Sequence, residues 1–105
     1  LYYLSLIQPQ DPAIGVNTFS CIFHRTNDDI HYYEIDSAKM FIRPWMESHG
    51  HGSSNNVDPV WKGGGIYEGK AVFTMPGNWD VYDSIKVNGT FITLSPPPKF
   101  SFLPH

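Results

Sequence analysis

The chain has 105 residues, about the size of one domain, and 41% of them are hydrophobic, so it can bury one modest core. Its formal net charge of -3 and its seven scattered Lys and Arg residues argue against a nucleic-acid partner, because a phosphate-binding surface needs clustered basic side chains. A single cysteine excludes an internal disulfide framework, and no apolar run reaches the roughly 18 residues that a membrane span requires.

Short segments rich in aromatic and β-branched residues follow one another along the first half of the chain, separated by glycine and proline. They predict strands at 1–7, 17–25, 30–35 and 38–46. In the second of these segments Phe19, Cys21 and Phe23 share one face, so we expect them in the core. Pro44 restricts the fourth segment to an edge or to the end of a strand.

A long polar loop at 47–59 opens the second half, and further strands are predicted at 70–75 and 80–87. Asn88-Gly89 is the strongest hairpin signal in the chain, because a type I′ turn needs positive φ at both central residues. A core stripe is expected on the strand before it, formed by Trp79, Val81, Ile85 and Val87.

About seven short strands in some 100 residues predict an all-β fold, an immunoglobulin-like antiparallel β-sandwich. We expect a single sandwich domain over residues 1–95. The three consecutive prolines that follow predict a Pro-rich C-terminal tail or edge segment at 96–105.

Enzymatic signals are weak, and we expect a non-enzymatic domain. The chain has no G-x-S-x-G motif for a serine nucleophile. Cys21 lies on the predicted core face, where a thiol is normally inert. The adjacent carboxyl groups of Asp28 and Asp29 belong to a sequence typical of turns.

The segment Met46-Glu47-Ser48-His49-Gly50-His51 has the composition of a metal-binding loop. Copper(I) is a soft ion that accepts thioether sulfur and imidazole nitrogen, so Met46, His49 and His51 favour copper. Glu47 or Asp58 would serve zinc, the less favoured metal.

Two other interpretations stay open. From the spacing alone, a solvated loop of a structural or protein-interaction domain is the favoured interpretation of the histidines. Met46 would then lie in the core, because Met40, Ile42 and Met46 share strand parity. Met75 shares parity with Phe73, so core packing is its default role. Exposed aromatic residues could form a sugar-binding platform, although we expect most of them in the core.

Three ordered motifs resemble the YtkA-like/FixH-like family of bacterial domains. Met46 and His51-Gly52-Ser53 correspond to the family's Met and His-Gly-Ser, 65–69 to its Gly-x-Tyr-x-Gly, and 73–79 to its Phe-x-Met-x-Gly-x-Trp. The likeness covers roughly residues 13–94. Glu47 replaces the usual Pro, and His49 replaces a second Met, which exchanges one soft ligand for another.

The resemblance implies an extracytoplasmic domain, periplasmic or at the cell surface, often made as a lipoprotein or with a membrane tether in the full-length protein. Many relatives have no known function, and others are associated with copper handling. It therefore implies a copper ion bound by Met46, His49 and His51, with Met75 as a further ligand where its turn approaches the loop. The expected partner is a protein involved in copper delivery or efflux.

Overall fold

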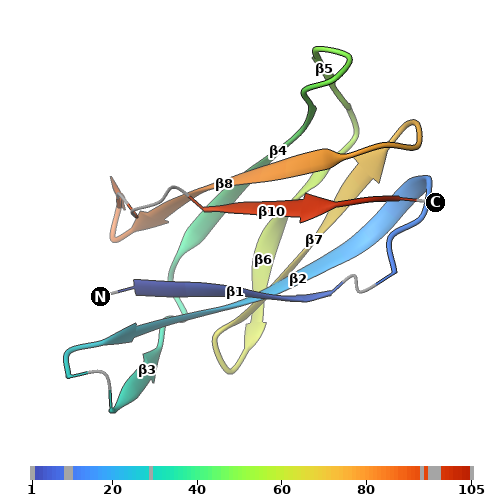
Figure 1. The fold of residues 1–105 in the computed structure, drawn as a ribbon. Helices are drawn as coiled ribbons and strands as arrows, with labels where there is room; N and C mark the ends of the chain where they lie inside the picture. The colour runs from blue at the N-terminus through green and yellow to red at the C-terminus, as the bar shows by residue number, and fades with distance from the viewer. Residues whose placement is uncertain (1, 9–10, 29, 93, 95–97, 105) are drawn as a thin grey trace.

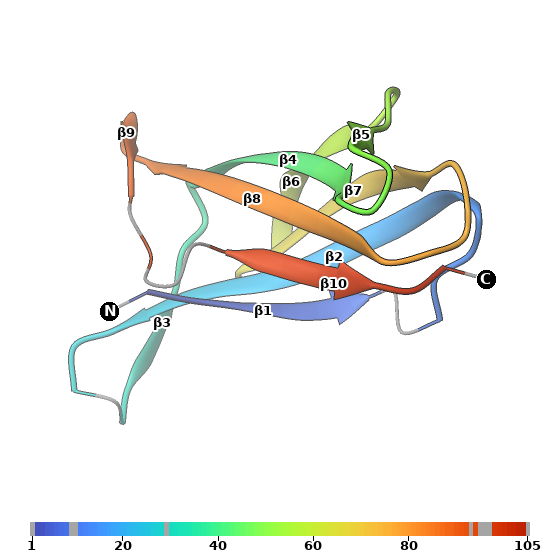
Figure 2. The same cartoon turned by 45° about the horizontal axis from the view of Figure 1, so that its top comes forward.

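The computed structural model describes residues 2–8, 11–28, 30–92, 94 and 98–104, and within these ranges it contains ten strands and no helix (Figures 1 and 2). No membrane-spanning helix occurs among these residues. The strands are β1 (Tyr2–Gln8), β2 (Gly15–Thr26), β3 (Tyr32–Glu34), β4 (Lys39–Met46), β5 (His51–Gly52), β6 (Val57–Gly63), β7 (Ile66–Phe73), β8 (Trp79–Val87), β9 (Thr90–Phe91) and β10 (Lys99–Phe102). Seven of them have four or more residues, which confirms an all-β fold of about seven strands.

Two antiparallel five-stranded sheets pack together. The first has the order β1-β2-β7-β6, with β3 joined to β2, and the second has the order β10-β8-β4-β5, with β9 joined to β8. Figures 1 and 2 show β8 and β10 passing over β2 and β7. Phe73 of β7 contacts the other sheet, because its ring centroid lies 5.5 Å from those of Trp79 and Phe102. The predicted β-sandwich is confirmed.

The core lies between the inner faces of the two sheets. Phe19, Cys21 and Phe23 of β2 are fully buried, as their alternation predicts. Trp79, Val81 and Ile85 of β8 are buried opposite them, and Val87 is half-buried at the end of the same stripe. Burial of large aromatic side chains contributes much of the stability of such a sandwich.

Tyr67, the tyrosine of the 65–69 motif, has a structural role. Its ring is fully buried in β7. The hydroxyl group donates to the carbonyl of Ile35 and accepts a hydrogen bond from the backbone N–H of Ala38 at 3.1 Å. These bonds connect the first sheet to the segment that leads from β3 into β4.

The hairpin predicted at Asn88-Gly89 is present. Both residues have positive φ, 52° and 78°, and they join β8 to β9 with Val87 opposite Thr90. The two-residue turn matches the twist of the flanking strands.

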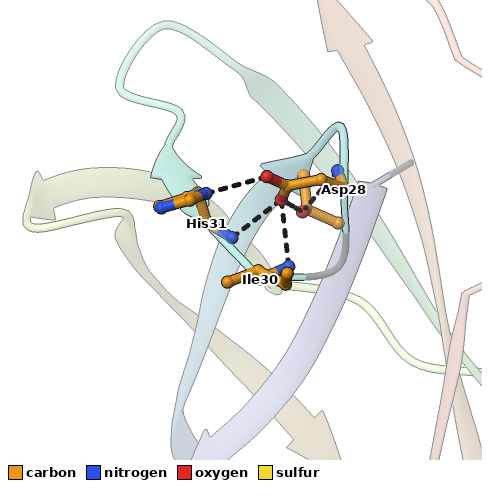
Figure 3. Close-up of polar contacts among 4 residues, drawn as sticks. Asp28, Ile30 and His31 are labelled. Atoms are coloured by element: carbon orange, nitrogen blue, oxygen red, sulfur yellow. Dashed lines mark hydrogen bonds and ion pairs between the residues drawn. The ribbon is translucent and has the colours of Figure 1, made fainter.

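The strand predicted at 30–35 is shorter, because the side chain of Asp28 holds the chain in a turn (Figure 3). Asp28 Oδ1 accepts the backbone N–H groups of Ile30 at 2.9 Å and His31 at 2.8 Å, and Oδ2 lies 2.8 Å from His31 Nδ1. The hydrogen bonds from His31, then that from Ile30, lower the pKa of Asp28 to about 2. The turn interpretation is thus confirmed for Asp28, whereas Asp29 lies outside the described residues.

The loop predicted at 47–59 has the wrong bounds. His51–Gly52 forms β5, and the last three residues of that range begin β6. β7 also begins earlier than expected, at Ile66. In the Pro-rich segment 96–105, Lys99–Phe102 forms β10, the edge strand beside β8, and Phe102 enters the core. Residues 96, 97 and 105 lie outside the described part of the chain.

Candidate metal centre

The Met/His segment forms a tight connection at one end of the second sheet. β4 ends at Met46, and β5 pairs back onto it with His51 directly opposite Met46 (Figure 2). The backbone N–H of Gly50 donates to the Met46 carbonyl at 2.9 Å and closes the turn. Gly50 has a φ of 64°, a left-handed conformation that glycine adopts without strain.

Met46 and His51 are brought together by this pairing. Directly opposed residues of antiparallel strands project to the same side, with Cβ atoms about 4.5–5.5 Å apart. Met46 is 1% exposed, so its side chain is part of the core, as its parity predicted. Its methyl group packs against Gly77, where any side chain would overlap it. The thioether therefore lies beneath the loop rather than on its surface.

His51 has the features expected of a metal ligand. It is half-buried, and its ring centroid lies 5.6 Å from that of Trp79 in an edge-on arrangement. Nδ1 lies 3.1 Å from the carbonyl oxygen of Gly52. A carbonyl oxygen only accepts hydrogen bonds, so this contact requires the proton on Nδ1 and leaves the lone pair on Nε2. That tautomer can bind a metal ion through Nε2.

His49 is exposed in the turn beside His51, with the ring centroids 6.0 Å apart. Two imidazoles on one ion, with metal–nitrogen bonds of about 2.0–2.1 Å, have centroids roughly 5–6 Å apart. The observed centroid separation lies at the upper end of this range. His49 Nδ1 lies 3.3 Å from the Ser48 hydroxyl, which can donate or accept, so the tautomer of His49 is not fixed.

Met75 is near this centre through its turn. The Trp79 indole N–H donates to the Met75 carbonyl at 3.0 Å, and Gly77 of the same turn contacts Met46. The side chain of Met75 is half-buried and packs against the core. The turn thus approaches the loop, as the role of Met75 as a ligand requires.

Each of the two carboxylates that would favour zinc accepts a hydrogen bond from another residue. Glu47 Oε2 accepts the indole N–H of Trp45 at 2.8 Å. Asp58 Oδ1 accepts the backbone N–H of Ile42 at 2.8 Å. Among the described residues no three His, Cys, Asp or Glu side chains gather into a metal-binding group. The thioether of Met46 and the imidazoles of His49 and His51 are the softer donors of this segment.

Two relevant residues are missed by the sequence reasoning. Trp79 was expected only in the core, yet it also contacts His51. Asp83 was not singled out, although it has the same parity as Val81 and Ile85 and is only 4% exposed. Burial and then the charge of Asp58 raise the pKa of Asp83 to about 7. The parity of β8 was the signal that could have revealed this buried carboxyl group.

The aromatic residues divide between core and surface. Trp79 and Tyr67 are fully buried, whereas Tyr32, Tyr33 and Trp61 are about half exposed. Tyr32 and Tyr33 are on β3, while Trp61 is on β6 at the other edge of the first sheet. The exposed rings of β3 and β6 therefore lie at opposite edges of the first sheet.

No curated protein and no solved structure is significantly similar to this chain. The sequence model of the YtkA-like family matches residues 2–82, which is more than half of the chain and includes β1–β7 and the Met/His loop. The match confirms the resemblance found in the motifs around Met46, Tyr67 and Trp79. The chain belongs to the YtkA-like family.

Proposed function

We propose that this domain is a non-enzymatic, extracytoplasmic metal-handling protein that binds a copper ion transiently through Met46, His49 and His51. The observation that carries the proposal is the position of His51, opposite Met46 in the β4–β5 pair and with Nδ1 against the Gly52 carbonyl. This arrangement directs Nδ1 to the carbonyl, leaves Nε2 as the nitrogen available to a metal ion, and places the imidazole and the thioether on the same side of the strand pair; both are donors that copper(I) accepts.

The choice of copper over zinc rests on the surrounding residues. Glu47 and Asp58 each accept one hydrogen bond, from Trp45 and Ile42, which orients these carboxylates toward other groups. A closed zinc site of the usual kind needs four N, S or O ligands, whereas two imidazoles and one thioether suit a soft monovalent ion.

Transient binding follows from the unequal exposure of the ligands. Met46 is buried, His51 is half-buried and His49 is exposed in the turn. The exposed side can be approached by a ligand of another protein, which allows an ion to be exchanged. Transfer to a protein partner in copper delivery or efflux is therefore the proposed role. Family membership supports an extracytoplasmic location, with a membrane tether in the full-length protein.

The proposal is tested by anaerobic titration with copper(I) against a competing chelator. The variant His49→Ala/His51→Ala removes both imidazoles, and Met46→Leu removes the sulfur at nearly constant volume, which preserves the core better than alanine. Binding of one equivalent, weakened at least tenfold by each variant, is the expected result. A control variant, His31→Ala, removes an exposed histidine of the β2–β3 turn and leaves the affinity unchanged.

A structural or protein-interaction domain without a metal site is the second candidate, and the burial of Met46 favours it. At 1% exposure the side chain of Met46 already has a role in the core, packed against Gly77. In that case copper(I) affinity is weak and is the same in the parent and in the His49→Ala/His51→Ala variant. That result would reject the proposed function.

A further inference from the structure

Asp83 is a buried carboxyl group whose side chain has no hydrogen-bond partner among the described residues. It lies on the inner face of β8 between Val81 and Ile85 and is only 4% exposed. Both side-chain oxygens are inaccessible to solvent, and neither has a hydrogen-bond partner in the described part of the chain. Nearly all buried polar groups in proteins are hydrogen-bonded, so an exception of this kind indicates a missing proton, water or ion.

Two sulfur atoms lie on the inner faces near Asp83. Met40 of β4 pairs with Ile85, two residues along β8 from Asp83, so Met40 and Asp83 are diagonal neighbours on one face. Cys21 of β2 faces them from the other sheet, and its Sγ lies 3.8 Å from Met40 Sδ. Burial, and then the charge of Asp83, raises the pKa of the Cys21 thiol to about 12, so the carboxyl group is electrostatically coupled to the thiol.

Three basic residues of the second sheet have partners other than Asp83. Arg43 lies over the rings of Trp45 and Tyr82, at 5.4 and 5.3 Å from their centroids. Lys86 lies 4.9 Å from the ring centroid of Phe91, and the Lys99 ammonium lies 3.9 Å from Asp80. Each of these cations therefore has an aromatic or acidic partner other than Asp83.

We propose that Cys21, Met40 and Asp83 form a second, internal site that takes one soft metal ion, with copper(I) as the probe. The Cys21 thiol donates to the Met40 thioether at 3.8 Å, and one ion bound to both sulfur atoms at about 2.3 Å in a tetrahedral arrangement would hold them roughly 3.8 Å apart, so it could replace the proton with little movement. The Cys21 S–H bond breaks and, below about pH 7, so does the O–H bond of the protonated Asp83; bonds from sulfur and oxygen to the metal form, and both protons leave to solvent, so no oxidant or reductant is needed. The carboxylate of Asp83 provides a negative charge and an oxygen ligand.

This site is separate from the loop. Its three residues are at most 4% exposed and lie inside the sandwich, whereas the loop ligands lie at the end of β4 and on β5. An ion held here would exchange slowly, because all three side chains are almost inaccessible to solvent. It would bind whether or not the loop binds copper.

The test uses the complete chain with His49→Ala/His51→Ala as the background, refolded from denaturant with buffered copper(I) under anaerobic conditions so that slow entry is no obstacle. After removal of weakly bound ion with a chelator, one equivalent is expected to remain, with sulfur ligands visible by X-ray absorption at the copper edge. Adding Asp83→Asn or Met40→Leu is expected to weaken its binding at least tenfold. Both changes nearly preserve volume, and thermal unfolding of each variant checks the fold.

Asp80→Asn in the same background is the matched control, because it removes a carboxylate of the same strand that contacts Ser101 and Lys99 outside the cluster, and it is expected to leave the retained equivalent unchanged. The proposal is overturned when no equivalent survives the chelator after refolding with copper(I). It is also overturned when Asp83→Asn and Met40→Leu retain copper as tightly as the background.

Discussion

The loop end of the sandwich and the middle of its core both contain a buried methionine near a polar side chain. The two polar side chains differ in their exposure and in their hydrogen bonding. At the loop end, His51 is half-buried and hydrogen-bonded to the Gly52 carbonyl. In the core, Asp83 is enclosed between the sheets with no hydrogen-bond partner among the described residues. A polar group at the rim retains water and backbone partners, whereas one in the interior destabilises the fold unless a proton or an ion compensates it.

The largest expected effect is a loss of stability when the core beneath the loop is truncated. Trp79→Ala removes a fully buried ring that packs on Phe73 and supports His51, and such a truncation costs about 3–5 kcal/mol of unfolding free energy. Chemical denaturation measures the loss. Trp61→Ala is the control, because that ring is 48% exposed and its removal is expected to have a much smaller effect. Equal losses in the two variants would contradict the assigned burial.

In the core, Asp83 is expected to make the stability of the fold depend on pH. The pKa of Asp83 is about 7 in the folded chain, against an ordinary value of 3.8. Between pH 3.8 and about pH 7, Asp83 is therefore protonated in the folded metal-free chain and ionised in the unfolded chain. Stability therefore falls as pH rises from about 4 to about 7 and is level above that, with a total change of up to about 4 kcal/mol.

Asp83→Asn removes this titration, so denaturation at several pH values is expected to give a flatter profile than that of the parent. The amide keeps the volume of the carboxyl group, which makes it a suitable replacement. A parent profile that is already flat over the same range would show that Asp83 has its ordinary pKa.

A smaller effect separates the two loop histidines. His51 is oriented by Trp79 and by the Gly52 carbonyl, whereas His49 is exposed and its tautomer is not fixed. His51→Ala is therefore expected to lower copper(I) affinity at least tenfold, and His49→Ala by only a few fold, because a preoriented ligand contributes more. Competition titrations measure the copper(I) affinity of each variant. A larger loss for His49→Ala than for His51→Ala would show that the orientation of His51 does not determine its contribution.

The smallest expected effect concerns the turn between β2 and β3, which contains Asp28 and His31 (Figure 3). Nuclear magnetic resonance titration is expected to give Asp28 a pKa of about 2, and His31→Ala to move it toward the ordinary value of 3.8. The lowered pKa means that the contribution of Asp28 to stability is present above 3.8 and is lost as pH falls through about 2. An unchanged pKa in His31→Ala would show that the backbone N–H of Ile30 and its neighbours act without the imidazole.

Much of the sandwich is predictable from local patterns. The alternation of β2 predicts Phe19, Cys21 and Phe23 in the core, and Asn88-Gly89 predicts its hairpin, because side-chain parity and positive φ are local properties of the chain. Element bounds are less predictable. Asp28 delays β3 through hydrogen bonds to Ile30 and His31 that strand propensity does not include.

The sequence by itself determined that this chain is an all-β, YtkA-like domain with a Met/His loop, because periodicity and motif order are written in it. Only the tertiary structure decided which donors meet. The β4–β5 register places His51 opposite Met46, and the packing of two sheets brings Cys21 next to Met40 near the unpartnered Asp83. Contacts between strands depend on register and sheet packing, which connect residues far apart in the chain and cannot be obtained from the pattern of one strand.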